Sequence, residues 1–340
     1  MDTLVDTAWL AGQLGLDPLE LQATGGERSG IEAAAHDGVD RRLSASLTLG
    51  RHSREAPVCR AGPGQASGES EGCGAAPLRI CDVRWYLDPA RRGRDAWRAG
   101  HIPGAVFLDV DEDLSAPGGG RGLPAGRHPW PPEEQLARAM GAAGIGPGVR
   151  VVAYDDASGS VAARLWYLLR AHGHDDVAVL DGGIARWVAE GRPVATDAPR
   201  VEPAVFTGRL RPGFVVDKVA MVAGHRRRLV LDARAAERYR GETEPIDPRA
   251  GHVPGARSAP WTGNVTADAV PVLRPAANLR RRYEALGAAA EEPIVYCGSG
   301  VTACHDLLAL HLAGLRGTLY AGSWSEWSSD PSLPAATGEE

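Results

Sequence analysis

Cys297 stands at the end of a short apolar run in the segment PIVYCGSGVTACHDLLALHLAGL, residues 293–315. Small residues follow it, and a helical pattern begins near Thr302. A thiolate is the reactive form of cysteine, and a free thiol has a pKa of about 8.5. A helix N-terminus and inward-turned backbone N–H groups would both stabilise an anion here. The pattern therefore predicts a nucleophilic cysteine held above an anion-binding loop.

The residues after the cysteine are suited to such a loop. Glycine adopts positive φ angles at little cost, and Ser299 adds a hydroxyl group close to the sulfur. We expect the loop to contact substrate through Gly298, Gly300, Val301 and Thr302. The alternative is a buried cysteine that only packs at a strand end, which is the common role of an isolated cysteine.

Two other chemistries fit this segment poorly. Cysteine phosphatases place an arginine six residues after the nucleophile, where this chain has Ala303, so the phosphate clamp is missing. Cys304 and His305 fall inside the helix, away from the loop, which argues against a shared metal site. We expect no metal and no organic cofactor, and Cys304 is expected to pack in the core.

The composition excludes several classes of protein. The net charge of −6 gives no reason to expect a nucleic acid or an anionic membrane as partner. Five cysteines without regular spacing do not form a disulfide framework. The chain has no long apolar run and its first residues do not resemble a signal peptide. We therefore expect a cytoplasmic protein in which a free thiol persists.

An internal repeat organises the chain. GHIPGAV at 100–106 recurs as GHVPGAR at 251–257, and VLDGGIARW at 179–187 recurs as LYAGSWSEW at 319–327. In each copy short apolar strands alternate with helices, which predicts an α/β fold: two tandem domains, each a parallel sheet with helices on both faces. Ligands of such sheets bind beyond the carboxyl ends of the strands, where Cys297 is expected to lie.

The repeat also sets the domain boundaries. The first domain is expected at 1–16 and 78–190, the second at 215–335, and a proline-rich linker at 191–214. The first domain is interrupted at 17–77 by an insertion rich in Gly, Ser and Ala. Its composition predicts disorder, and a small regulatory insert is the alternative.

The motifs CGSGVTAC, DVRWYL, DGG and the two GH[IV]PGA segments resemble the two-domain rhodanese family of sulfurtransferases. The resemblance covers about 78–335 and the first fifteen residues. It implies the rhodanese fold and a loop cysteine, Cys297, that accepts a sulfane sulfur as a persulfide. Asp155 occupies the equivalent position in the first copy, and a carboxylate cannot carry sulfur, so that copy is expected to be catalytically silent.

The resemblance also suggests the donor. Gly298 and Ser299 match the loop of 3-mercaptopyruvate sulfurtransferases, whereas thiosulfate enzymes have cations at these two positions. Arg238 and Arg249 match the family's two arginines that hold the substrate carboxylate, although this chain has two more residues between them than some members. Either arginine could instead be an exposed ion-pair residue.

Some family members use a Ser-His-Asp relay, which carried over here implies Ser299, His101 and Asp95 as catalytic residues beside Cys297. The alternative is that His101 and His252 both stabilise their turns, because the motif recurs in both copies. The resemblance thus implies transfer of sulfur from a small-molecule donor to a thiol, cyanide or thioredoxin-like acceptor. Thiosulfate:cyanide transfer and a non-enzymatic partner-binding or redox-sensing module are the alternatives.

Overall fold

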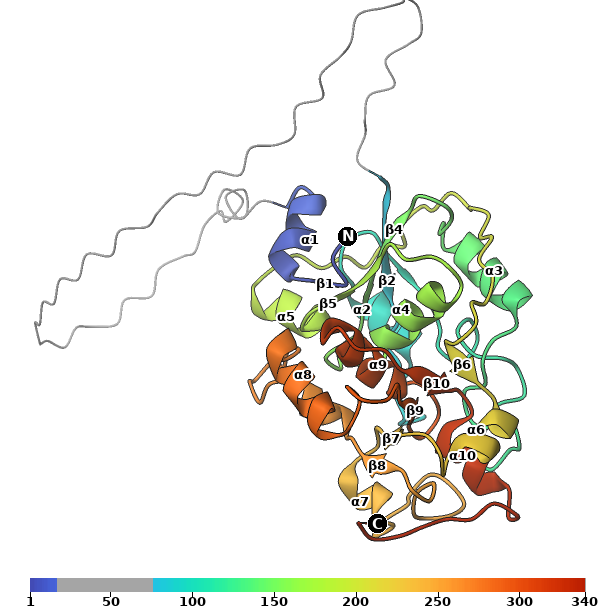
Figure 1. Ribbon diagram of the computed structural model, residues 1–340. Helices are drawn as coiled ribbons and strands as arrows, with labels where there is room; N and C mark the ends of the chain where they lie inside the picture. The colour runs from blue at the N-terminus through green and yellow to red at the C-terminus, as the bar shows by residue number, and fades with distance from the viewer. Residues whose placement is uncertain (17–75, 340) are drawn as a thin grey trace, which may run out of the picture. The chain divides into compact units, whose positions relative to one another are not determined.

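The computed structural model describes residues 1–16 and 76–339 of the chain. The insertion expected at 17–77 therefore lies outside the described residues, apart from its last two positions. Each half of the described chain forms one five-stranded sheet (Figure 1), and every strand pair in both sheets is parallel. The expected fold class, two tandem α/β domains, is confirmed.

The first sheet has the strand order β1-β5-β4-β2-β3. Its strands are β1 (Leu4–Val5), β2 (Leu78–Asp82), β3 (Ala105–Phe107), β4 (Arg150–Tyr154) and β5 (Val177–Leu180). Its helices are α1 (Thr7–Gln13), α2 (Gly93–Ala99), α3 (Glu133–Ala142), α4 (Ala162–Ala171) and α5 (Gly183–Ala189).

The second sheet repeats this order as β6-β10-β9-β7-β8. Its strands are β6 (Val215–Val216), β7 (Val230–Asp232), β8 (Arg257–Ser258), β9 (Ile294–Tyr296) and β10 (Thr318–Tyr320). Its helices are α6 (Lys218–Gly224), α7 (Ala236–Tyr239), a 3₁₀ turn (Trp261–Asn264), α8 (Ala276–Ala285), α9 (Ala303–Leu312) and α10 (Ser323–Ser329). The identical order shows that the sequence repeat is a repeat of the whole domain.

Each sheet is covered on both faces because its strand side chains alternate between two apolar clusters. In β2, Ile80 packs under α1 and α5, whereas the next residue, Cys81, packs towards α3 and α4. Strands buried on both faces are apolar almost throughout, which explains the short runs of Val, Ile and Ala in the sequence.

Helices α4 and α9 lie side by side and join the two domains (Figure 1). Both helices are apolar on nearly all sides and almost fully buried, as expected for helices in the middle of a core. One continuous apolar cluster includes Leu165 and Leu168 of α4 together with Leu307 and Leu308 of α9. The two domains therefore share a core, and the loops that precede α4 and α9 are held close to the shared interface.

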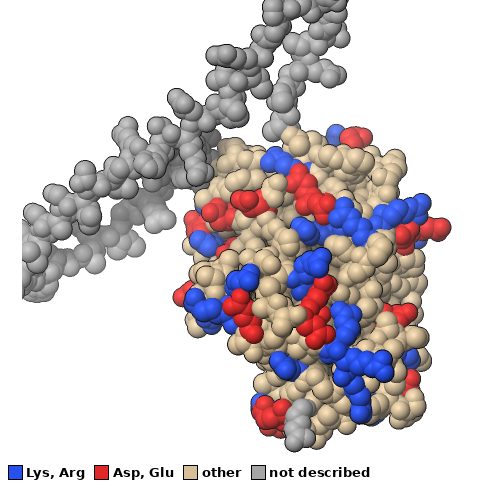
Figure 2. Space-filling view, viewed as in Figure 1, with Lys and Arg blue, Asp and Glu red and all other residues tan. Residues whose placement is uncertain are grey.

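The segment between the domains contains no helix or strand. It runs along the first domain through backbone hydrogen bonds, with Ala195 paired to His101 and Ala204 bonded to the Gly141 carbonyl. On the face shown in Figure 2, Lys and Arg side chains are interspersed with Asp and Glu. The helices of the described residues are too short to cross a bilayer.

Candidate active site

Cys297 lies directly after β9, at the carboxyl end of the second sheet, and α9 begins six residues later at Ala303. The side chain is buried, with 1% of its surface exposed. The Gly300 N–H points back at the sulfur, with a distance of 3.1 Å between N and Sγ. Gly300 has φ 78°, and a Cβ there would lie 2.5 Å from the Ala321 carbonyl oxygen. Only glycine fits this turn without displacing its neighbours.

Ser323 fixes the backbone of the cysteine from the opposite side. Its hydroxyl accepts the Cys297 N–H at 3.1 Å and donates to the Tyr320 carbonyl at 3.0 Å. It does so from φ 54°, a left-handed conformation that costs a non-glycine residue roughly 1–2 kcal/mol. The equivalent residue of the first domain is Gly183, also at φ 54°. At this position the domain that contains Cys297 therefore has a strained serine, where the other domain has glycine.

The remaining residues of the loop are placed as follows. Val301 is buried, and Thr302 is the N-cap position of α9, although its side chain makes no capping hydrogen bond. The S–H of Cys304 donates to the Gly300 carbonyl at 3.3 Å from inside the core. Burial raises the pKa of Cys304 to about 12, so it remains a neutral thiol.

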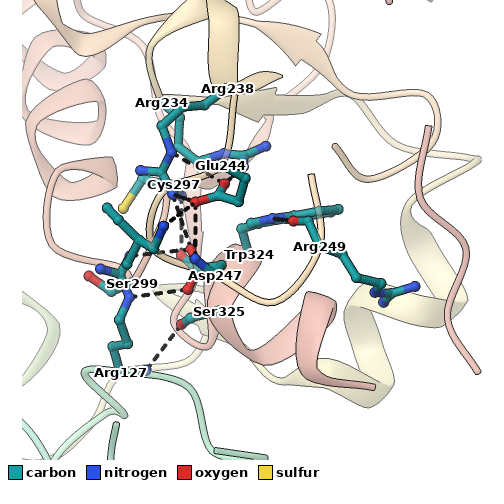
Figure 3. A network of polar contacts seen from close by, with 12 residues as sticks. Arg127, Arg234, Arg238, Glu244, Asp247, Arg249, Cys297, Ser299, Trp324 and Ser325 are labelled. Carbon is teal, nitrogen blue, oxygen red and sulfur yellow. Dashed lines mark hydrogen bonds and ion pairs between the residues drawn. The ribbon is translucent and has the colours of Figure 1, made fainter. Parts of the chain in front are cut away.

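Two arginines cover the loop at Gly298. A Cβ at this glycine would collide with Nη2 of Arg127 and would lie 3.5 Å from Nη1 of Arg238. Figure 3 shows Arg127 reaching the loop from the first domain, while Arg238 comes from α7. Glycine at position 298 therefore leaves room for two guanidinium groups immediately above the cysteine loop.

Two buried carboxylates hold these arginines. Arg238 donates to Glu244 at 2.6 Å and to Asp247 at 3.1 Å. Arg127 Nε lies 3.3 Å from Asp247 Oδ1, but its only side-chain hydrogen bond to the described residues is a long one of 3.5 Å from Nη2. Burial lowers the pKa of Arg127 and raises that of Asp247. Arg127 is thus a buried guanidinium with unused donors that faces the cysteine loop.

Arg249 is not part of this cluster, so the placement expected from the sequence is wrong. Its guanidinium binds the carbonyl groups that end α10, at Trp327, Ser328, Asp330 and Leu333, over 2.7–3.0 Å. Figure 3 shows it pointing away from Cys297. The additional residues between Arg238 and Arg249 carry the second arginine past the site, where its cation caps the C-terminus of a helix.

His101 and Asp95 are also remote from Ser299, so the relay carried over from the resemblance is not assembled. The ring of His101 is fully buried, stacks on Trp97 and bonds to the carbonyl groups of Trp97 and Asp197. The side chain of Asp95 is 67% exposed and pairs with Arg98. His252 binds its own turn in the same way, through the Tyr239 carbonyl and ring. The recurring histidines are structural.

His128 occupies the position that the sequence analysis gave to His101. Its Nδ1 lies 2.7 Å from Ser299 Oγ and its Nε2 lies 2.9 Å from Asp111 Oδ1. Trp85 donates its indole N–H to the other oxygen of Asp111 and packs edge-on against the imidazole. A serine of the second domain is thereby linked to a histidine and an aspartate of the first.

The hydrogen bonds of this relay define its protonation state. A carboxylate accepts only, so the ring proton of His128 is on Nε2, and Nδ1 accepts the Ser299 hydroxyl proton. Burial lowers the pKa of His128, although Asp111 opposes this, and the hydrogen bond from His128 lowers the pKa of Asp111. Neutral imidazole beside ionised carboxylate is therefore the resting state near neutral pH, and it can accept a proton from Ser299.

The sequence contained a signal that separates His128 from His101. His101 recurs in the second copy as His252, whereas His128, in the segment GRHPW at 126–130, has no counterpart there. A structural residue of the common fold is expected in both copies. A residue that completes a single active site is needed in only one of them.

A cavity of about 740 Å³ opens beside the relay on the first domain. Arg127, His128 and Asp111 are among the residues that line it, together with the aromatic side chains of Trp85 and Tyr86. Among the described residues, no His, Cys, Asp and Glu side chains are grouped so that three of them could hold a metal ion.

The comparisons with known proteins show the family to which the chain belongs. The rhodanese-like domain model matches residues 68–190 and 218–330. The chain is 44% identical over 268 residues to a probable 3-mercaptopyruvate sulfurtransferase of Pseudomonas aeruginosa, covering 77% of this chain and 93% of the relative. It is 39% identical over 269 residues to a putative thiosulfate sulfurtransferase of Mycobacterium tuberculosis, covering 77% and 92%.

Among solved structures, SseA from Escherichia coli, described as a 3-mercaptopyruvate sulfotransferase, superimposes with a TM-score of 0.64. The identity is 31%, over 73% of this chain and 92% of that one. The chain therefore belongs to the rhodanese family. Within the family it is a tandem-domain sulfurtransferase of the class that includes the 3-mercaptopyruvate and thiosulfate enzymes.

Proposed function

We propose that the protein transfers a sulfane sulfur from 3-mercaptopyruvate to an acceptor through a persulfide on Cys297. The observation that carries the choice of donor is the under-bonded guanidinium of Arg127 above Gly298. A buried cation with free donors needs an anionic partner, and guanidinium groups bind carboxylates in a bidentate manner. The donor's carboxylate would lie between Arg127 and Arg238, with its sulfur towards Cys297.

The first step conserves atoms and charge. The Cys297 thiolate attacks the donor sulfur, the C–S bond breaks, and its electron pair remains on the leaving carbon as the enolate of pyruvate. The proton from the donor's S–H passes to that carbon, which gives pyruvate and leaves the persulfide anion. The Ser299–His128–Asp111 relay is placed to carry this proton, because His128 is neutral and accepts from Ser299.

In the second step an acceptor takes the outer sulfur and the Cys297 thiolate is regenerated. Cyanide would leave as thiocyanate, and a thiol would leave as a persulfide. The cavity beside His128 offers a route by which a small acceptor, or the thiol of a thioredoxin-like protein, could approach the loop. No metal or organic cofactor takes part in either step.

Thiosulfate is the second candidate donor, because one relative is a putative thiosulfate sulfurtransferase. It is a dianion without a carbonyl group, so it has no leaving carbon that requires a proton. The uncharged Gly298 and Ser299 and the proton relay favour the keto acid.

Two measurements test this proposal. Cys297→Ser should abolish pyruvate release from 3-mercaptopyruvate and thiocyanate formation from thiosulfate, with Cys304→Ser as the matched control that retains both. The ratio of kcat/KM for the two donors then decides between them. A clear preference for thiosulfate would overturn the choice of donor, and turnover by Cys297→Ser would overturn the mechanism.

A further inference from the structure

Arg164 is a fully buried cation with no carboxylate partner among the described residues. It lies in the first turn of α4, in the domain without the cysteine, and its side chain has no exposed surface. The guanidinium reaches the other domain, where Nη1 donates to the Gly300 carbonyl at 3.0 Å. Nη2 lies 3.2 Å from the Leu114 carbonyl and 3.3 Å from that of His128. Removing a charge from water without a counter-ion costs several kcal/mol, so this arrangement needs a reason.

Two buried thiols, Cys304 and Cys297, lie in the loop and helix that Arg164 contacts through Gly300. Burial lowers the pKa of Arg164, and Cys304 and Cys297 oppose that effect. Cys304 cannot supply the missing negative charge near neutral pH, because burial raises its pKa to about 12 and its S–H is already donated to Gly300. Cys297 is the remaining group that could become an anion beside this cation.

The contact with Gly300 also orders the loop around the sulfur. The Gly300 carbonyl receives both Arg164 Nη1 and the Cys304 thiol, while the Gly300 N–H points at the Cys297 sulfur. Nη2 meanwhile donates to the carbonyl group of the relay histidine, His128, and to that of the next residue, Pro129. The Arg164 guanidinium thus fixes the cysteine loop relative to the segment that contains His128.

The equivalent residue of the other domain behaves differently. His305 occupies the same place in the first turn of α9 and reaches back to the first domain, with Nε2 3.2 Å from the Ser158 carbonyl. Burial lowers the pKa of His305 to about 4, so it is uncharged near neutral pH. The loop that contains Asp155 is therefore braced by a neutral ring, and the loop that contains Cys297 is braced by a cation.

We propose that Arg164 is the counter-ion and positioning residue of Cys297, stabilising its thiolate and persulfide from inside the protein. The inference rests on the proposed role of Cys297 as sulfur carrier. The other charged or titratable groups around the loop are Arg127, Arg238, Glu244, Asp247 and His128, and both of these arginines have a carboxylate within 3.3 Å. Arg164 differs from the two arginines because it has no carboxylate neighbour among the described residues.

The test is the pH dependence of Cys297 alkylation by iodoacetamide, followed by mass spectrometry of the Cys297 peptide. Arg164→Gln should raise the apparent thiol pKa and slow alkylation at pH 7 by roughly tenfold, since an opposite charge favours the thiolate. Arg164→Lys retains the charge and should recover part of that loss. His305→Gln is the matched control, and it should alter only thermal stability.

Equal thiol pKa values in the wild type and in folded Arg164→Gln would overturn the proposal, because a purely structural arginine changes stability alone. If Arg164→Gln does not fold, the wild-type protein and Arg164→Lys still decide. Arg164→Lys keeps the charge, so a counter-ion predicts alkylation of folded Arg164→Lys at pH 7 within about threefold of the wild-type rate. A loss of about tenfold in folded Arg164→Lys would refute the inference. Alkylation does not depend on the donor, so an incorrect substrate would leave this result intact.

Discussion

The loop after β4 and the loop after β9 have the same position in their domains and opposite contents. In the first domain the Asp155 carboxylate fills the loop and accepts four backbone N–H groups, from Ala157, Gly159, Val161 and Ala162, at 2.7–2.8 Å. In the second domain the Cys297 sulfur receives one N–H contact, from Gly300. One loop is filled by a buried carboxyl group, whereas the other contains a thiol.

This difference shows how the two copies of a duplicated domain keep the same fold with different residues in the equivalent loop. Asp155 is fully buried, and burial raises its pKa while the four N–H bonds oppose that effect. Its two oxygens accept these four N–H groups, so the same donors are not available to a substrate anion. The first domain instead supplies Arg127, His128 and Arg164 to the site of the second.

The largest expected effect is on the free energy of unfolding, at the loop that contains Asp155. Asp155→Ala should lower the free energy of unfolding by about 4 kcal/mol, since each buried N–H left without a partner costs roughly 1–3 kcal/mol. Urea denaturation followed by circular dichroism measures the loss. Cys297→Ala is the control at the equivalent position and should cost about 1 kcal/mol. Similar losses at both positions would mean that the two loops are stabilised alike.

The next largest effect distinguishes His128 from His101, two histidines of the first domain. His128→Gln should lower kcat for 3-mercaptopyruvate by about a hundredfold, the usual contribution of a proton-transfer group. His101→Gln should leave kcat of the folded protein unchanged and reduce its melting temperature, because it removes a bond to a buried turn. Steady-state kinetics and thermal unfolding measure the two effects. A full kcat in His128→Gln would remove the relay from the mechanism.

Substitutions of Arg127 and Arg249 test whether an arginine of the first domain or this arginine of the second domain binds the substrate. Arg127→Met should raise KM for 3-mercaptopyruvate by about thirtyfold, since hydrogen bonds to a charged group contribute about 2 kcal/mol. Arg249→Met should leave KM unchanged and lower the melting temperature, because the side chain caps α10. The opposite pattern would restore Arg249 as the substrate-binding arginine.

The smallest effect is a shift in the pH profile. Because burial lowers the pKa of His128, the acid limb of kcat/KM should lie below pH 6.5, where protonation of the ring stops it accepting from Ser299. Asp111→Asn removes the carboxylate that raises this pKa, so the limb should move to lower pH. Rates measured from about pH 4.5 to 8 test both points. An acid limb above pH 6.5 would show that another group controls the reaction.

The fold and the position of the candidate nucleophile could be predicted because their signals are local. The strands are continuous apolar runs, the repeat fixes the order of elements, and Cys297, its glycines and the start of α9 are adjacent in the sequence. Arg238 was expected at the substrate from the resemblance to the family, and it lies in α7 with its guanidinium close to Gly298.

The relay and the role of Arg127 were missed because they depend on contacts between distant segments. Ser299 and His128 are 171 positions apart, and Arg164 and Gly300 are 136 apart. Residues 108–131 form no helix or strand, so they carry no periodic pattern that fixes where their side chains point. The placement of Arg249 was not predicted for a different reason, because it depends on the exact length of an irregular loop.

Helices α4 and α9 each contact the loop of the opposite domain, and this reciprocal arrangement bears on the origin of the protein. Arg164 reaches from the first domain to the loop of the second, and His305 reaches from the second to the loop of the first. A pair of equivalent residues that each contact the other copy is the arrangement of a twofold dimer interface. An ancestral single domain that paired through this helix would have braced two equal loops at once. Each loop is thus supported by the opposite copy, whether it contains Asp155 or Cys297.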